Sequence, residues 1–257
     1  LRRVPGEIID KVIYLVQGRL YPEYVGIELG MAEKMVERAI SHASGLPLAE
    51  IESFYKKLGD LGEVAAQALS KRKAFALTSF LDIENQKKLT VKEVYETLDK
   101  IAKATGEGSQ DLKIKLFAGL LNKASPREAR YLARFIIGEL RLGIADMTIL
   151  DALAIAYGGS KDYRPILERA YNLTSNLGEV AKAVALKGIE AAKEFHITVG
   201  RPIRPMLAER LSTPLEILAK LGGTCAAEYK YDGERIQAHK KNSNVVLFSR
   251  KLENITH

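Results

Sequence analysis

Apolar residues recur along residues 7–195 at the three- and four-residue spacing that gathers them on one face of a helix. Loops rich in glycine and polar residues interrupt this spacing, as at residues 105–109 and 158–160. No run in this range alternates apolar and polar residues as a half-buried strand does. The pattern therefore predicts roughly ten helices without an internal repeat.

Two of the predicted helices carry a complete start signal. Thr90 and Ser125 are each followed three residues later by a glutamate, Glu93 and Glu128, which is the spacing of a capping box. Pro126 stands at the first helical position, where its missing N–H leaves no hydrogen bond unmade. We therefore expect helices to begin directly after Thr90 and Ser125.

The pattern changes after residue 196, where Pro202 and Pro205 prevent a helix from continuing. We place a domain boundary there, with one domain over residues 1–199 and a second over residues 200–257. The predicted fold class is mainly α: an all-helical domain followed by a short α+β segment.

The second segment is predicted to begin with a short helix from residue 214 and to continue with strands over residues 225–229, 235–240 and 245–249. The last two strands form a hairpin, because asparagine and serine between them favour a turn. Alternation places four candidate core residues on one face of this hairpin: Ile236, Ala238, Val245 and Leu247. Three strands and one short helix make a poor core, so we expect the chain to be a fragment of a longer protein.

The composition is that of a globular protein, with 47% hydrophobic and 28% charged residues among 257. Charges interrupt every long apolar stretch, so we expect no transmembrane segment and no signal peptide. Cys225 is the only cysteine and the four histidines do not cluster, which excludes an internal disulfide and predicts no metal site. These features favour an intracellular, cytoplasmic protein. The net charge of +7 is compatible with a polyanionic partner.

The most informative stretch is residues 228–235, Glu-Tyr-Lys-Tyr-Asp-Gly-Glu-Arg, which joins two predicted strands. The pattern Lys-x-Asp-Gly-x-Arg arises by chance in such a chain in well under about one case in a hundred. Asp-Gly is also a strong hairpin-turn signal, so Lys230 and Arg235 could be ordinary solvated residues beside a turn. On the residues alone, both interpretations stay open.

Four stretches together resemble the ATP-dependent DNA ligase family, and most closely its archaeal branch. Residues 228–235 resemble the first nucleotidyltransferase motif of these enzymes, and residues 248–250, Phe-Ser-Arg, resemble the short motif that follows it. Residues 139–146 and 104–111 resemble parts of the helical DNA-binding domain of archaeal and eukaryotic replicative ligases. The resemblance implies that the helical domain binds DNA and that residues 200–257 begin the nucleotidyltransferase (adenylation) domain.

The resemblance further implies that Lys230 is the catalytic nucleophile, which attacks the α-phosphate of ATP while Mg²⁺ neutralises the phosphates. Glu228 precedes Lys230 by two residues in the same predicted strand, so both side chains face one side, and Glu228 is implied to accept a hydrogen bond from the adenine amino group. The other nucleotide-binding residues that the resemblance implies are Asp232, Gly233, Arg235 and Arg250.

In the family, AMP passes to the 5′-phosphate at a nick and the 3′-hydroxyl then displaces it. Later family motifs and the C-terminal OB-fold domain have no counterpart before His257. The chain is therefore expected to be a nucleoid-associated monomer that binds nicked duplex DNA but does not ligate alone. Two alternatives stay open: a non-catalytic module that binds nicked DNA or a sliding clamp, and another lysyl nucleotidyltransferase such as an RNA ligase or an mRNA capping enzyme.

A row of arginines is the first candidate DNA contact. On one continuous helix, four of them would fall within a stripe of roughly 60°, spread along about 21 Å, which suits a row of phosphates. These arginines are Arg127, Arg130, Arg134 and Arg141, with Leu132, Ile136 and Leu140 on the opposite face. The alternative is an ordinary solvated face, partly neutralised by Glu128 and Glu139.

Small residues in loops are the second candidate, because exposed backbone amides at helix starts bind phosphates without reading sequence. The residues implied are Gly106, Gly108, Ser109 and Gly143, although Gly143 could equally be a plain helix C-cap. Residues 73–82 occupy roughly the place of an archaeal sliding-clamp peptide, which predicts clamp contacts by Leu77, Phe80 and Leu81. That stretch lacks the usual starting glutamine, and core packing is the alternative for each of the three.

Overall fold

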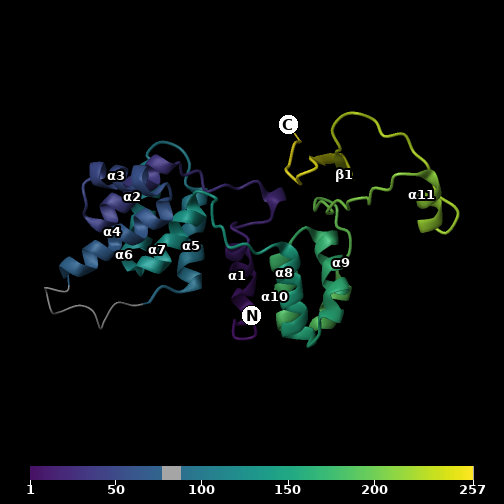
Figure 1. Cartoon of the computed structure of the whole chain (residues 1–257), viewed down its shortest axis with the longest axis horizontal. Helices are drawn as coiled ribbons and strands as arrows, with labels where there is room; N and C mark the ends of the chain where they lie inside the picture. Colours follow the sequence, from purple (N-terminus) through teal and green to yellow (C-terminus); the bar gives the residue numbers. More distant parts are fainter. Residues whose placement is uncertain (77–87, 257) are drawn as a thin grey trace.

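A computed structural model of the chain describes residues 1–76 and 88–256. Figure 1 shows two helical bundles, followed along the chain by one short helix that stands apart from both and then by a hairpin. Within the described residues the fold is mainly α with one two-stranded sheet, so the predicted fold class is confirmed. No helix of the described residues has the length and apolar character needed to cross a membrane.

The first bundle contains six α-helices that share one hydrophobic core. They are α2 (Glu33–Ser44), α3 (Leu48–Leu58), α4 (Leu61–Ala76), α5 (Val91–Lys103), α6 (Ser109–Lys123) and α7 (Pro126–Ile136). Large side chains such as Phe117 and Leu121 of α6 are fully buried between α2, α5 and α7 residues of this core. Each helix turns a stripe of apolar residues inward, as the spacing in the sequence predicts.

The predicted capping boxes differ in outcome. The Ser125 hydroxyl accepts from Glu128 N–H, and the Glu128 carboxylate accepts from Ser125 N–H, so this capping box of α7 is confirmed. Thr90 caps α5 through the backbone N–H of Glu93, but the Glu93 carboxylate instead pairs with Lys123 of α6. The second box is therefore only half formed, because a tertiary ion pair takes its glutamate.

The second bundle joins helices from both ends of the helical region. It contains α1 (Ile9–Val16), α8 (Asp146–Leu153), which continues as a π-helical turn (Ala154–Gly158), α9 (Arg164–Thr174) and α10 (Leu177–Lys187). The buried side chains of this bundle form a second core that is separate from the first. Short 3₁₀ turns complete the helical region at Gly6–Ile8, Glu23–Val25, Lys161–Tyr163 and Ile189–Glu194. The predicted single helical domain thus contains two cores.

The hairpin consists of β1 (Gln237–Lys241) and β2 (Asn244–Phe248), paired in antiparallel register with Lys241 opposite Asn244. The predicted hairpin is confirmed, with its turn at Asn242, which has φ 57°. The predicted strand over residues 225–229 is wrong, since no segment of the described chain pairs with it.

The predicted inward face of the hairpin is also wrong. Ile236, Ala238 and Val245 are exposed and Leu247 is half-buried, whereas Phe248 of the opposite face is buried. The reason lies in residues 200–203, whose backbone bonds to the side chains of β1. Gly200 N–H donates to His239 Nδ1 at 3.0 Å, and Ile203 N–H donates to Gln237 Oε1 at 3.1 Å.

The helix α11 (Pro214–Lys220) begins with a complete capping box at Thr213 but buries none of its residues. Every residue from 221 to 236 is exposed as well. Met206, Leu207 and Leu215 each expose at least 80% of their surface. This stretch has local structure without a core.

Candidate functional site

Lys230 lies in an exposed, irregular segment between α11 and β1. Neighbouring Tyr229 and Tyr231 are also exposed, with ring centroids 6.4 Å apart. Among the described residues, Lys230 has no ion-pair partner within 4.0 Å. A lysine becomes a nucleophile when its amine is desolvated or placed beside other cations, and the described residues provide neither condition at Lys230.

The chain bends at Asp232 and Gly233 without forming a hairpin there. Asp232 Oδ1 accepts from Gly233 N–H at 3.1 Å, and Gly233 has φ 139°, which side chains disfavour. Glu228 and Arg235 are exposed, and the strand that was predicted to align Glu228 with Lys230 is not formed. The sequence-predicted nucleotide site is thus present as a motif but is not assembled as a pocket around Lys230.

Arg250 follows β2 and lies on a different part of the molecule from the Lys230 segment. It lines a cleft of about 470 Å³ together with Lys251, Arg204 and Arg19. Arg19 is engaged by Glu23 at 2.7 Å, whereas Arg250 and Lys251 have no carboxylate partner among the described residues. The structure therefore brings Arg250 together with cations of the helical region.

The predicted row of four arginines on one helix is not formed. The helix α7 ends at Ile136, because Gly138 with φ 75° closes it. Gly138 N–H donates to Phe135 O and Glu139 N–H donates to Arg134 O, which is the Schellman pattern of a helix end. Arg141 consequently lies outside the helix, with φ 48° and with its guanidinium paired to Glu139.

The two middle arginines of α7 hold α4 rather than facing solvent. Arg134 donates from Nη2 to Asp60 Oδ2 at 2.7 Å and from Nε to both oxygens of the same carboxylate, and its side chain is only 17% exposed. Arg130 pairs with Glu63 at 2.9 Å. Hydrogen bonds from Arg134 lower the pKa of Asp60, which also caps α4 through Gly62 N–H. Of the four arginines, Arg127 and Arg141 are the ones that are exposed.

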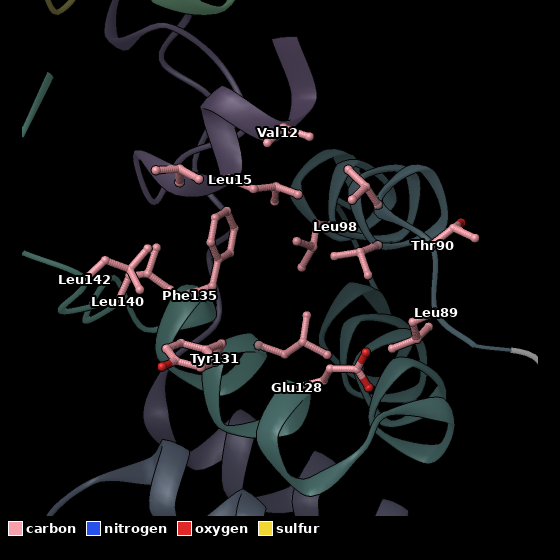
Figure 2. Close-up of a pocket in the computed structure, with 14 residues that line it drawn as sticks. Val12, Leu15, Leu89, Thr90, Leu98, Glu128, Tyr131, Phe135, Leu140 and Leu142 are labelled. Atoms are coloured by element: carbon pink, nitrogen blue, oxygen red, sulfur yellow. The ribbon is translucent and has the colours of Figure 1, made fainter. Parts of the chain in front are cut away.

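The loop of residues 139–145 packs on the first core through Leu140. Figure 2 shows Leu140 and Leu142 lining an apolar pocket of about 400 Å³ beside Phe135 and Tyr131, and Leu142 is 39% exposed. Arg141 between them keeps 60% of its side chain exposed. Gly143, with φ 65°, is not a helix C-cap as the alternative supposed, because α7 has already ended at Gly138. The loop therefore offers Arg141 and the Gly143 backbone at the surface.

A second exposed loop begins α6. Gly108 is its N-cap with φ 75°, Gly106 has φ 84°, and no side chain caps this helix start. Ser109 N–H donates to Gly106 O at 3.2 Å, whereas the N–H groups of Gln110 and Asp111 have no acceptor among the described residues. Such a start suits a phosphate oxygen.

Two further predictions concern the clamp contacts and a metal site. The clamp candidates Leu77, Phe80 and Leu81 lie outside the described residues. In residues 1–76 and 88–256 no group of three or more His, Cys, Asp or Glu side chains could hold a metal ion.

One cluster was missed by sequence reasoning. Asp146, Tyr171 and Arg204 meet between α8, α9 and the segment after the second bundle. Burial raises the pKa of Tyr171, and its hydrogen bond to Asp146 raises that pKa further. The sequence signal for this cluster was the position of Arg204 directly before Pro205. A residue before proline is held extended and does not continue a helix, which left Arg204 available for a contact with the helical region.

Comparison with known proteins gives a family for both parts of the chain. Residues 1–154 match the family model described as DNA ligase N terminus. Residues 205–257 match the model described as ATP dependent DNA ligase domain, which includes the Lys230 segment.

Curated relatives match the chain along nearly all of its length. DNA ligase 2 of Thermofilum pendens is 55% identical over 256 residues, which is 100% of this chain and 43% of that relative. The DNA ligase of Staphylothermus marinus is 54% identical over 263 residues, with 100% of this chain and 44% of the relative covered. The DNA ligase of Saccharolobus solfataricus is 55% identical over 250 residues, covering 97% and 42%. The chain thus spans about two fifths of the length of these relatives.

Proposed function

Because the chain belongs to the ATP-dependent DNA ligase family, we propose that the protein seals nicks in duplex DNA through a lysyl-AMP intermediate. The observation that carries the proposal is the match at 54–55% identity, which runs through both the helical region and the Lys230 segment of DNA ligases. RNA ligases and capping enzymes share the short lysine motif, but the proposal rests on the helical match as well.

In the proposed reaction, the Lys230 amine attacks the α-phosphate of ATP. A nitrogen–phosphorus bond forms, the bond to the β-phosphate breaks, and pyrophosphate leaves with the electron pair. Glu228 accepts from the adenine amino group, while Arg235 and Arg250 contact the ribose or phosphates as forked donors. AMP then passes to the 5′-phosphate of the nick, and the 3′-hydroxyl displaces it to join the strand.

In the proposed reaction Mg²⁺ would enter with ATP, bound to its phosphates. Among the described residues no group of His, Cys, Asp or Glu side chains fits a metal ion held by the protein.

For the DNA contact, we propose the two exposed loops and the exposed arginines. Arg141 and Gly143 of the loop 139–145, Gly106 to Ser109 at the start of α6, and Arg127 would contact the phosphates of a duplex. Their support is exposure, the uncapped start of α6, and packing of Leu140 against the first core. Arg130 and Arg134 contribute indirectly, because they fix α7 on α4.

The remaining parts of the proposal concern the protein's surroundings. We propose a monomer that is intracellular and associated with the nucleoid, in keeping with DNA as its substrate. Docking of the replication sliding clamp through Leu77, Phe80 and Leu81 is part of the same proposal, supported by the position of that segment in the sequence.

The second candidate function is a module that binds nicked DNA without catalysis. The exposure of the whole stretch 221–236 favours it for this chain taken alone. The two candidates differ in one product, since only the ligase forms covalent protein–AMP.

The test is labelling of the complete protein with ATP that carries a radioactive α-phosphate. We expect Lys230→Ala to abolish the covalent label and to leave nicked-duplex affinity nearly unchanged. Lys240→Ala is the matched control, because Lys240 is an exposed lysine of β1 in the same segment. Persistent label in the Lys230 variant would move the nucleophile elsewhere, and no label in the unaltered protein would favour the non-catalytic module.

A further inference from the structure

One carboxylate receives contacts from three elements that are distant in the sequence. Gln17 Nε2, at the end of α1, donates to Asp146 Oδ1 at 2.7 Å. The Tyr171 hydroxyl of α9 donates to Asp146 Oδ2 at 2.6 Å, and Arg204 Nη2 lies 3.6 Å from the same oxygen. Asp146 is the first residue of α8, so it also marks the end of the loop 139–145.

Arg204 is held from several sides at once. Its Nη1 donates to the Tyr171 hydroxyl at 2.7 Å, and its guanidinium carbon lies 4.4 Å from the centroid of the Tyr171 ring. Its backbone N–H donates to Asn172 O at 2.8 Å. Because the Tyr171 hydroxyl accepts from Arg204 and donates to Asp146, this buried group connects the two charges directly.

The residues before Arg204 are fixed in the same way. Arg201 Nη1 donates to both carboxylate oxygens of Glu179, at 2.9 and 2.8 Å. Ser175 Oγ donates to Pro202 O at 2.6 Å. The segment 200–204 is therefore attached along one side to α9 and α10.

The other side of this segment carries the hairpin. Gln237 exchanges two hydrogen bonds with the Ile203 backbone, one of them from Nε2 to Ile203 O at 2.7 Å, and His239 accepts from Gly200 N–H. Lys230 precedes Gln237 by seven residues. The chain that carries the candidate nucleophile thus rejoins the molecule on the segment that Arg204 holds.

We propose that Asp146 and Tyr171 are positioning residues that couple the loop 139–145 to the segment 200–204. A shift of the loop moves the start of α8 and with it the oxygen that Tyr171 and Arg204 share. In a charge-assisted network centred on the buried Tyr171 hydroxyl, few alternative arrangements keep all the hydrogen bonds, so such a shift is passed on rather than absorbed. DNA contact at Arg141 and Gly143 would thereby be felt where the hairpin docks, and this last step rests on the proposed function.

The test is amide hydrogen exchange of the 257-residue chain, read in peptides covering residues 139–146 and 200–205. Tyr171→Phe removes only the connecting hydroxyl and keeps the ring beneath Arg204. We expect both peptides of the free variant to exchange about fivefold faster, as loss of one hydrogen bond implies. Nicked duplex should slow exchange at 200–205 in the unaltered chain and should do so much less in the variant.

Tyr95→Phe is the matched control. It removes a hydroxyl of α5 that donates one hydrogen bond of 2.5 Å, to Leu20 O, outside the hydrogen bonds that reach Asp146 and the segment 200–204. Both peptides should exchange in this variant as in the unaltered chain. If Tyr171→Phe folds poorly, Arg204→Ala is the second variant. It removes no core atoms, and we expect the same faster exchange in both peptides.

Several results would overturn the coupling. Faster exchange at 200–205 with no change at 139–146 would reduce Tyr171 to a local anchor. Equal effects of Tyr95→Phe and Tyr171→Phe would indicate general loosening of the helical region. DNA binding without any change at 200–205 would remove the transmission step. If the unaltered chain bound no nicked duplex, the proposed DNA function would fail, while the free-chain comparison would still decide the coupling.

Discussion

The first helical bundle and the stretch 206–236 come from one chain, yet they differ in how they satisfy the same physical demands. In the bundle, Phe117 is fully buried, whereas Tyr231 in the stretch is 84% exposed. Helices make their backbone hydrogen bonds internally and need only a covered face, but a strand makes its ladder hydrogen bonds only to neighbouring strands. The difference shows that the helical region closes its own hydrophobic cores, while the stretch that carries Lys230 has only local structure.

Two aromatic truncations test this comparison with the largest expected effect. Phe117→Ala should destabilise the chain by about 3–5 kcal/mol, because it removes a buried ring and leaves a cavity. Tyr231→Ala should change the free energy of unfolding by no more than about 0.5 kcal/mol, as an exposed residue does. Urea unfolding followed by circular dichroism measures both, and equal effects would erase the distinction between the regions.

Within the bundle, two arginines of α7 should behave differently. Arg134→Ala leaves Asp60 without its partner in a largely buried position, which we expect to cost about 2–3 kcal/mol. Arg127→Ala, on the exposed side of the same helix, should stay within about 0.5 kcal/mol of the unaltered chain. Thermal unfolding of the two variants side by side checks this, and a stable Arg134 variant would return that side chain to the DNA-facing row.

DNA affinity should separate the helical region from the exposed stretch. Arg141→Ala should weaken binding to nicked duplex a few-fold, by roughly 1 kcal/mol, and lower the slope of log affinity against log salt by about 1. Arg210→Ala, an exposed arginine of the stretch 206–236, serves as the control and should leave both quantities unchanged. Fluorescence anisotropy across a salt series measures both the affinity and its salt dependence. A larger loss of affinity in Arg210→Ala than in Arg141→Ala would place the DNA on the stretch 206–236 instead of the helical region.

The smallest predicted effect concerns pH. Because Arg134 lowers the pKa of Asp60 in the folded chain, the carboxylate adds stability above its unfolded value of about 3.9. That stability is lost as pH falls through the lower folded-state value. Between pH 6 and pH 3 the thermal midpoint of the unaltered chain should therefore fall more steeply than that of Asp60→Asn. Parallel curves would show that the Arg134 contact does not hold the Asp60 charge.

The helical half was largely predictable because its signals are local. Apolar spacing and the Ser125 box place α7 correctly, and its end was equally marked by Gly138. Treating Arg141 as part of the same helix overlooked that glycine. The two separate cores could not be predicted, since the pairing of α1 with α10 joins residues that lie far apart in the sequence.

The hairpin shows where local signals stop. Its turn and register follow from the sequence, but the buried face depends on whichever segment covers it. Here the backbone of residues 200–203 bonds Gln237 and His239, so polar side chains take the covered side. The strand over residues 225–229 failed for a related reason, because alternation predicts a strand only where a partner is present.

The candidate site divides in the same way. The Lys230 motif could be recognised from residue types and spacing alone, and the chain bends at Asp232 and Gly233 within it. The role of Arg134 was not legible, because Asp60 lies 74 residues away and nothing in α7 indicates it. Ion pairs between distant helices are decided by packing, which one sequence does not display.

We propose that the helical region of this chain binds nicked duplex DNA even though no nucleotide pocket is assembled around Lys230. The most direct measurement is equilibrium binding of the 257-residue chain to nicked duplex, intact duplex, single-stranded DNA and duplex RNA across a salt series. We expect the chain to bind duplex DNA with an affinity that falls steeply with salt, because phosphate contacts release counterions. Absence of duplex binding, or a preference for RNA, would contradict it.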